Sequence, residues 1–226
     1  MLKDFLAEPK NKIIQQIVEN ERSFCQNNYN GDQKKKDVAE VVHGKIPVIL
    51  STPHSVNHTR EDGTFKEVDT FTGGIGQVVQ RYTGCSLVYL AGSGRGFKVR
   101  QTRYRNALRA VMPENEGRVF LIDLHGAKKG SPFDVDLGTL YGKSISSHFV
   151  EEIKEKFLAN GISDVRENFK FSAGNKTTVT NYAYNHLKIP AVQMEVEYRF
   201  RDANGDATSV WALTKSLVEI IEFLSR

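Results

Sequence analysis

Four short apolar runs, rich in β-branched residues, constrain the fold of this chain more than any other feature. They lie at 47–51, 86–90, 119–124 and 191–196. Uninterrupted apolar runs of this length are typical of strands that are covered on both faces of a sheet. Between and after them, apolar residues recur at helical spacing. Those segments lie at 75–79, 104–111, 145–157 and 210–224. Because strands alternate with helices, the sequence predicts a three-layer α/β/α sandwich around a mixed, mostly parallel sheet.

The chain of 226 residues suits one domain, and we expect a single α/β domain over residues 1–226. Ile13, Ile14, Ile17 and Val18 recur at helical spacing and predict a helix over 10–22. A polar stretch follows that helix. We therefore expect residues 1–40 to form an N-terminal helical arm that packs on the domain.

Composition and charge argue against several classes of protein. The net charge of +4 is mild, and the one tight basic run, Lys34 to Lys36, has no aromatic residues interleaved for base stacking. We expect no nucleic-acid partner. Neither a secretory signal nor an apolar stretch of roughly 20 residues is evident, so we expect a cytoplasmic protein without a membrane partner. The two isolated cysteines, Cys25 and Cys85, fit reduced thiols.

Polar residues follow or interrupt three of the apolar runs. The first run leads into Ser51-Thr-Pro-His54, the third contains Asp123 and leads into His125, and the fourth contains Glu195. In open α/β sheets, ligands bind beyond the carboxyl ends of the strands. Either histidine alone could be an ordinary turn residue bonded to backbone. Together with the glutamate, they predict a site that combines a metal and a base.

Catalytic zinc takes three protein ligands, usually histidine and carboxylate, and keeps one position for a water molecule that becomes the nucleophile. A carboxylate that is not a ligand can accept the proton of that water. Asp69 is the preferred third ligand, with Glu67 in reserve. Both acids precede a helix that Thr70 or Thr72 could cap, so either could instead be placed there by the helix dipole.

The remaining candidates surround this predicted centre. Asp123 could orient a ligand histidine, and His58 lies near His54 in the same polar loop. Arginine grips both oxygens of a carboxylate, which makes Arg103, Arg105 and Arg199 candidates for binding a substrate carboxylate. The first two could equally belong to a solvated helix face.

Two further patterns bear on the chemistry. One strand face is predicted to carry two acids and two arginines at alternate positions, namely Glu195, Glu197, Arg199 and Arg201. These side chains could instead form a structural ladder of ion pairs. The glycine-rich segment 92–96 does not fit the spacing of a dinucleotide or P-loop motif, and no GxSxG elbow occurs. Phosphate binding and serine hydrolysis are therefore not favoured.

The sequence resembles the N-formylglutamate amidohydrolase family. The resemblance rests on four short segments in the expected order, which together cover residues from about 46 to 200. They are Ser51-Thr-Pro-His54-Ser55, Asp69 within Lys-Glu-Val-Asp-Thr, Ile122-Asp-Leu-His125 and Val192-Gln-Met-Glu195. The resemblance implies a phosphorylase/hydrolase-like sandwich related to the zinc carboxypeptidases.

By matching positions, the resemblance implies one Zn²⁺ ion held by His54, Asp69 and His125, with Glu195 as general base and acid. The expected activity is hydrolysis of an amide bond in an N-acyl amino acid or a similar small, carboxylate-bearing molecule. After Glu195, where the family pattern has an Asn-Arg pair, this chain has Val196-Glu197. A binding protein that keeps the fold without turnover is the alternative.

Overall fold

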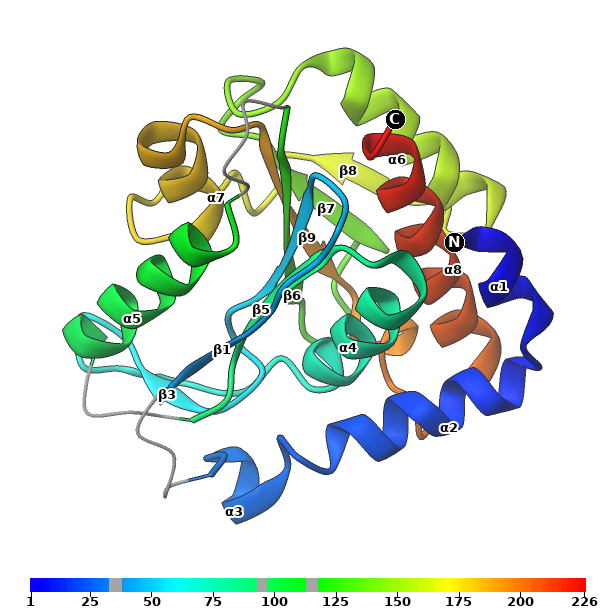
Figure 1. Ribbon diagram of the computed structural model, residues 1–226, viewed down its shortest axis with the longest axis horizontal. Helices are drawn as coiled ribbons and strands as arrows, with labels where there is room; N and C mark the ends of the chain where they lie inside the picture. The colour runs from blue at the N-terminus through cyan, green and yellow to red at the C-terminus, as the bar shows by residue number, and fades with distance from the viewer. Residues whose placement is uncertain (33–37, 93–96, 113–117) are drawn as a thin grey trace.

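The computed structural model describes residues 1–32, 38–92, 97–112 and 118–226 (Figure 1). The basic run at Lys34 to Lys36 and most of the glycine-rich segment 92–96 lie outside these residues. Within the described ranges, seven strands form one sheet in the order β1-β5-β2-β6-β9-β7-β8. They are β1 (Ala39–Val42), β5 (Ser86–Leu90), β2 (Val48–Thr52), β6 (Phe120–Gly126), β9 (Ala191–Val196), β7 (Val135–Gly138) and β8 (Val165–Glu167).

Strands β5, β2, β6 and β9 form the parallel centre of the sheet. They are the four apolar runs, and every residue of β2, β5 and β9 is buried. The outer strands β1 and β7 pair antiparallel with β5 and β9, and β8 pairs parallel with β7. The predicted mixed, mostly parallel sheet is therefore confirmed.

Helices cover both faces of the sheet and complete the predicted three layers (Figure 1). On one face lie α4 (Thr72–Thr83), α6 (Ser147–Ala159) and α8 (Ala207–Leu224). On the other lie α5 (Phe97–Ala110) and α7 (Val179–Tyr182), which continues into a π-helical turn over Ala183–Leu187. A small hairpin of β3 (His58–Thr59) and β4 (Phe65–Lys66) stands apart from the sheet. No helix in the described part of the chain has the length and apolar character needed to cross a bilayer.

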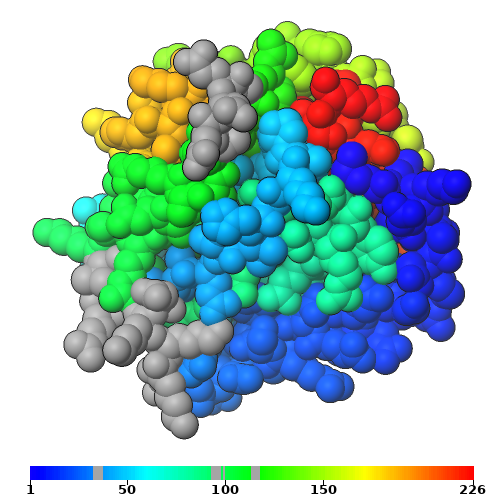
Figure 2. All heavy atoms as spheres, viewed as in Figure 1, coloured from blue at the N-terminus to red at the C-terminus, as the bar shows by residue number. Residues whose placement is uncertain are grey.

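The N-terminal helices pack on the layer that contains α4 and α8. They are α1 (Leu2–Ala7) and α2 (Lys10–Glu21), and the short α3 (Gln26–Tyr29) follows α2. Phe5 stacks on Trp211 of α8 with ring centroids 4.7 Å apart, and Ile13 and Ile17 of α2 are fully buried. Figure 2 shows these helices, in blue, along the edge of the molecule beside α4. The predicted helix over 10–22 is confirmed.

The start of α4 is capped by Glu21 of α2, and not by Thr70 or Thr72. Phe71 occupies the N-cap position with φ at 67° and provides no side-chain cap. The buried carboxylate of Glu21 accepts hydrogen bonds from the backbone N–H of Phe71 at 2.7 Å and of Gly74 at 3.1 Å. Because α4 begins three residues after Asp69, this contact between helices also fixes the segment that carries a predicted ligand.

We expect Glu21→Ala to lower the free energy of unfolding by about 3 kcal/mol, because two buried N–H groups would lose their acceptors. Urea denaturation measures this change. The matched control is Glu19→Ala on the same helix, an exposed residue whose loss should cost less than about 0.5 kcal/mol. Equal effects of the two substitutions would contradict the assigned cap.

Candidate metal centre

His54 and His125 are brought together by two adjacent parallel strands. β2 and β6 pair in a register that sets Ser51 opposite Asp123, so both chains leave the sheet at the same edge. His54 follows the end of β2, and His125 lies near the end of β6. Their ring centroids lie 4.7 Å apart, in an edge-to-face arrangement. The two predicted histidines therefore meet at the carboxyl ends of the strands.

Asp69 joins these histidines from the loop that follows the β3–β4 hairpin. Its backbone N–H donates to the carbonyl of His54 at 2.8 Å, which holds the two loops together. One ligand atom from each of His54, Asp69 and His125 lies within 4.8 Å of the other two. Glu67, the reserve candidate, is exposed to solvent and does not belong to this group.

The donor set fits zinc. Two imidazoles and one carboxylate are a common catalytic set, and they leave a fourth position open. Nδ1 of His54 is buried and has no hydrogen-bond partner among the described residues. A buried nitrogen without a partner is costly unless something binds it, and a metal ion would satisfy it. His54, Asp69 and His125 could thus hold one ion.

The two histidines differ in electrostatic environment. Burial, together with the neighbouring His125 and Lys66, holds the pKa of His54 well below its usual value, so this ring is neutral and ready to bind a metal. Burial would also lower the pKa of His125, but Asp123, Glu195 and Asp69 raise it to about 9. At neutral pH, metal binding would therefore displace a proton from His125.

Asp123 faces Nε2 of His125, a buried nitrogen that has no hydrogen bond of good geometry among the described residues. Both side chains project from the same face of β6, and Nε2 of His125 lies 3.1 Å from Oδ2 of Asp123. Asp123 is itself held by the hydroxyl of Ser51 at 3.1 Å and by the backbone N–H of Thr180 at 3.2 Å. The remaining nitrogen, Nδ1, lies 3.8 Å from Oδ2 of Asp69. This is the usual arrangement of a metal-bound imidazole and its carboxylate partner.

Glu195 lies beside this group, on the neighbouring strand β9. The register pairs it with His125, and its Oε1 lies 3.9 Å from Nδ1 of that ring. Gln193 donates to the same oxygen at 2.8 Å. Burial raises the pKa of Glu195, and the nearby His125 offsets part of that rise. Glu195 is thus a buried carboxylate beside the three candidate ligands, and this position suits a proton acceptor.

His58 forms a wall of the site. Its ring stacks on that of His54 with centroids 4.8 Å apart, and its Nδ1 lies 3.0 Å from the carbonyl of Val56. Burial lowers the pKa of His58 to about 4, so the ring stays neutral. The structure thus places His58 in contact with a candidate ligand, but outside the group of three.

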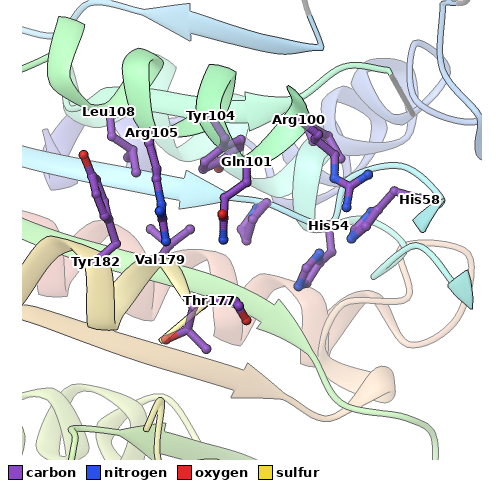
Figure 3. Close-up of a pocket in the computed structure, with 13 residues that line it drawn as sticks. His54, His58, Arg100, Gln101, Tyr104, Arg105, Leu108, Thr177, Val179 and Tyr182 are labelled. Atoms are coloured by element: carbon purple, nitrogen blue, oxygen red, sulfur yellow. The ribbon is translucent and has the colours of Figure 1, made fainter. Parts of the chain in front are cut away.

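The candidate ligands open into a cleft of about 800 Å³. Next to it is a side pocket of about 80 Å³, between α5 and residues 177–182 (Figure 3). Gln101 and Arg105 of α5 point toward Val179 and Tyr182 across this pocket, and His54 stands at its other end (Figure 3). The site can therefore receive a molecule that extends to either side of the candidate ligands.

The three candidate arginines lie in different places. Arg105 lines the side pocket, where its guanidinium lies 4.6 Å from the centre of the Tyr182 ring. Arg103 lies on another face of α5 and lines neither cavity. Arg199 is also outside the cleft: its side chain is 60% exposed and pairs with Asp134. Of the three, only Arg105 is placed to contact a substrate.

Sequence reasoning missed the role of Arg201. The chain leaves β9 and turns into a 3₁₀ helix over Tyr198–Phe200, so the predicted alternation along one strand face stops after Val196. Arg201 is buried and donates to the carbonyls of Thr70 at 2.6 Å and Ala127 at 2.8 Å. It ties the loop after Asp69 to the loop after His125. A strand-based interpretation gave no signal for this contact.

Comparisons with known proteins identify the fold. No protein-family model matches the sequence, and no curated protein shows significant similarity to it. Among solved structures, N-formylglutamate amidohydrolase from Ralstonia eutropha JMP134 superposes with a TM-score of 0.60 at 13% identity, over 82% of this chain and 97% of that chain.

Two other solved structures are also similar. Glutaminyl cyclase from Porphyromonas gingivalis gives a TM-score of 0.54 at 13% identity, over 82% of this chain and 76% of that one. A bacteriophage poly-γ-glutamate hydrolase gives 0.52 at 17% identity, over 85% of this chain and 90% of that one. At such identities the likeness concerns the fold. The chain therefore has the α/β fold of N-formylglutamate amidohydrolase and related hydrolases.

Proposed function

We propose that the protein is a zinc-dependent hydrolase that cleaves an amide bond in an N-acyl amino acid or a similar small, carboxylate-bearing molecule. One Zn²⁺ ion would be held by His54, Asp69 and His125. The observation that carries this proposal is the convergence of those three side chains, whose ligand atoms lie within 4.8 Å of one another. The shared fold with N-formylglutamate amidohydrolase supports the same reaction class.

Zinc, when bound, would acidify a water molecule and polarise the amide carbonyl. Glu195 would take the proton from the attacking water and pass it to the nitrogen of the leaving amine. Asp123 would keep His125 oriented throughout, because it contacts the ring nitrogen that faces away from Asp69. The stacked rings of His54 and His58 would limit the entry of bulk water on their side of the site.

Unpaired cations around the cleft support a carboxylate-bearing substrate. Lys128 and Lys170 line the cleft, and neither of them forms an ion pair with an Asp or Glu that the structure describes. Arg105, which lines the side pocket, also forms no ion pair with an Asp or Glu that the structure describes. Cations that lack acidic partners favour an anionic ligand. The fold shared with a poly-γ-glutamate hydrolase adds γ-glutamyl peptides to the compounds worth testing.

The test combines metal analysis with a substrate screen. Purified protein is expected to contain about one zinc per chain and to hydrolyse members of a panel of N-acyl amino acids and γ-glutamyl peptides. Dialysis against a chelator should abolish hydrolysis, and added Zn²⁺ should restore it. Protein that takes up no zinc would overturn the proposal. A zinc-loaded protein that binds members of the panel without cleaving them would instead support a binding protein.

A further inference from the structure

The two carboxylate oxygens of Asp69 have different neighbours. Oδ2 faces Nδ1 of His125 at 3.8 Å. Oδ1 instead forms an ion pair with the ammonium group of Lys66. The same ammonium donates to the carbonyl of Glu67 at 2.9 Å, and the Lys66 side chain is only 18% exposed. One oxygen of the candidate ligand is therefore already occupied by a charged donor.

The position of Lys66 is fixed by the backbone. Lys66 ends strand β4, where it pairs with His58 across the hairpin. The His58 ring stacks on His54, and the carbonyl of His54 accepts the backbone N–H of Asp69. The hairpin, the first histidine and the aspartate thus form one connected unit. Lys66 is held against Asp69 by these contacts as well as by charge attraction.

A carboxylate can bind a metal ion through one oxygen or through both. If both oxygens of Asp69 bound the ion, the second would add a fifth ligand and crowd the position that water needs in a catalytic site. We propose that Lys66 is a positioning residue of the proposed zinc site, which holds Oδ1 of Asp69 so that only Oδ2 is offered to the ion. This inference rests on the proposed function. Gln193 holds one oxygen of Glu195 in the same way.

Lys66→Met separates this role from a purely structural one. The substitution frees Oδ1 and removes a positive charge beside the ion, and both changes favour metal binding. Zinc should therefore bind at least as tightly as in the wild type, while kcat falls about 10- to 100-fold. If Lys66 served only to stabilise the fold, Lys66→Met would bind zinc more weakly than the wild type. Lys66→Arg, which can still donate to Oδ1, should recover most of the loss in kcat.

Cobalt substitution reports the coordination directly. The wild type loaded with Co²⁺ should show the intense visible bands of a four-coordinate ion, and Lys66→Met the weaker bands of a five-coordinate ion. Lys128→Met, which changes a lysine of the same cleft without an acidic partner among the described residues, should keep the wild-type spectrum. Identical spectra for Lys66→Met and the wild type would overturn this inference and leave the proposed function intact.

X-ray absorption of the zinc-loaded wild type adds a test that needs no variant to fold. One oxygen from Asp69, two imidazoles and one water predict four light atoms around the zinc. A fifth close oxygen would overturn the inference. A wild type that takes up neither zinc nor cobalt would overturn the proposed function, and this role of Lys66 with it.

Discussion

Glu195→Gln is expected to leave zinc binding unchanged and to lower kcat by about 10²- to 10⁴-fold, the range that a general base contributes. Glutamine has nearly the same shape and can still accept the hydrogen bond from Gln193, but it cannot take a proton from water. Because the carboxylate is buried, the neutral amide also avoids the cost of burying a charge. Zinc content and kcat on the best compound of the substrate panel measure the two parts of this result.

Glu197 is the matched control for this experiment. It is also buried, two residues further along, but its carboxylate accepts the backbone N–H groups of Gly130 at 2.8 Å and Arg199 at 2.7 Å, away from the candidate ligands. Glu197→Gln should therefore change kcat far less than Glu195→Gln. Full activity in Glu195→Gln would show that another group takes the proton.

The centre of the fold was predictable because burial on both faces leaves a strong pattern in sequence. The four parallel strands read as apolar runs, and the helices between them as periodic segments. The strands β1, β7 and β8 were not predicted, because they are short and contain charged residues. Asp136 in β7 is an example: it is fully buried, yet its carboxylate accepts three backbone N–H groups from 169–171. Only the folded chain provides those partners.

The candidate site was predictable where strands deliver its residues. His54, His125 and Glu195 follow or lie within apolar runs, so the sheet geometry alone places them at one edge. Asp69 comes from a loop, and sequence spacing could not separate it from Glu67. In the folded chain the Asp69 backbone bonds to His54, and the Asp69 side chain, unlike that of Glu67, lies with the two histidines. Lys66 and Arg201 act through contacts with distant loops or with a neighbouring carboxylate, and such contacts leave no periodic signal.

His54→Ala is expected to abolish both zinc binding and hydrolysis. The substitution removes one of three protein ligands. Loss of a residue that only hydrogen-bonds to a ligand lowers metal affinity roughly 10- to 100-fold, so loss of the ligand itself should lower zinc affinity further. Without the ion, neither water activation nor carbonyl polarisation would be available. Zinc content after dialysis against a weak chelator measures the first loss, and hydrolysis of the best panel compound measures the second. The fold should persist, because the ring lines the cleft and its Nδ1 bonds to no other described residue.

His58→Ala is the control that gives this experiment its meaning. The two rings are stacked, and both line the cleft, so His58 is the nearest residue that could serve as a ligand in place of His54. His58 already has the carbonyl of Val56 within bonding distance of Nδ1, whereas Nδ1 of His54 has no partner in the described structure. We therefore expect His58→Ala to keep about one zinc per chain. If His58→Ala lost the ion and His54→Ala kept it, His58 and not His54 would be the ligand. The roles proposed for Asp69, His125 and Glu195 would not change.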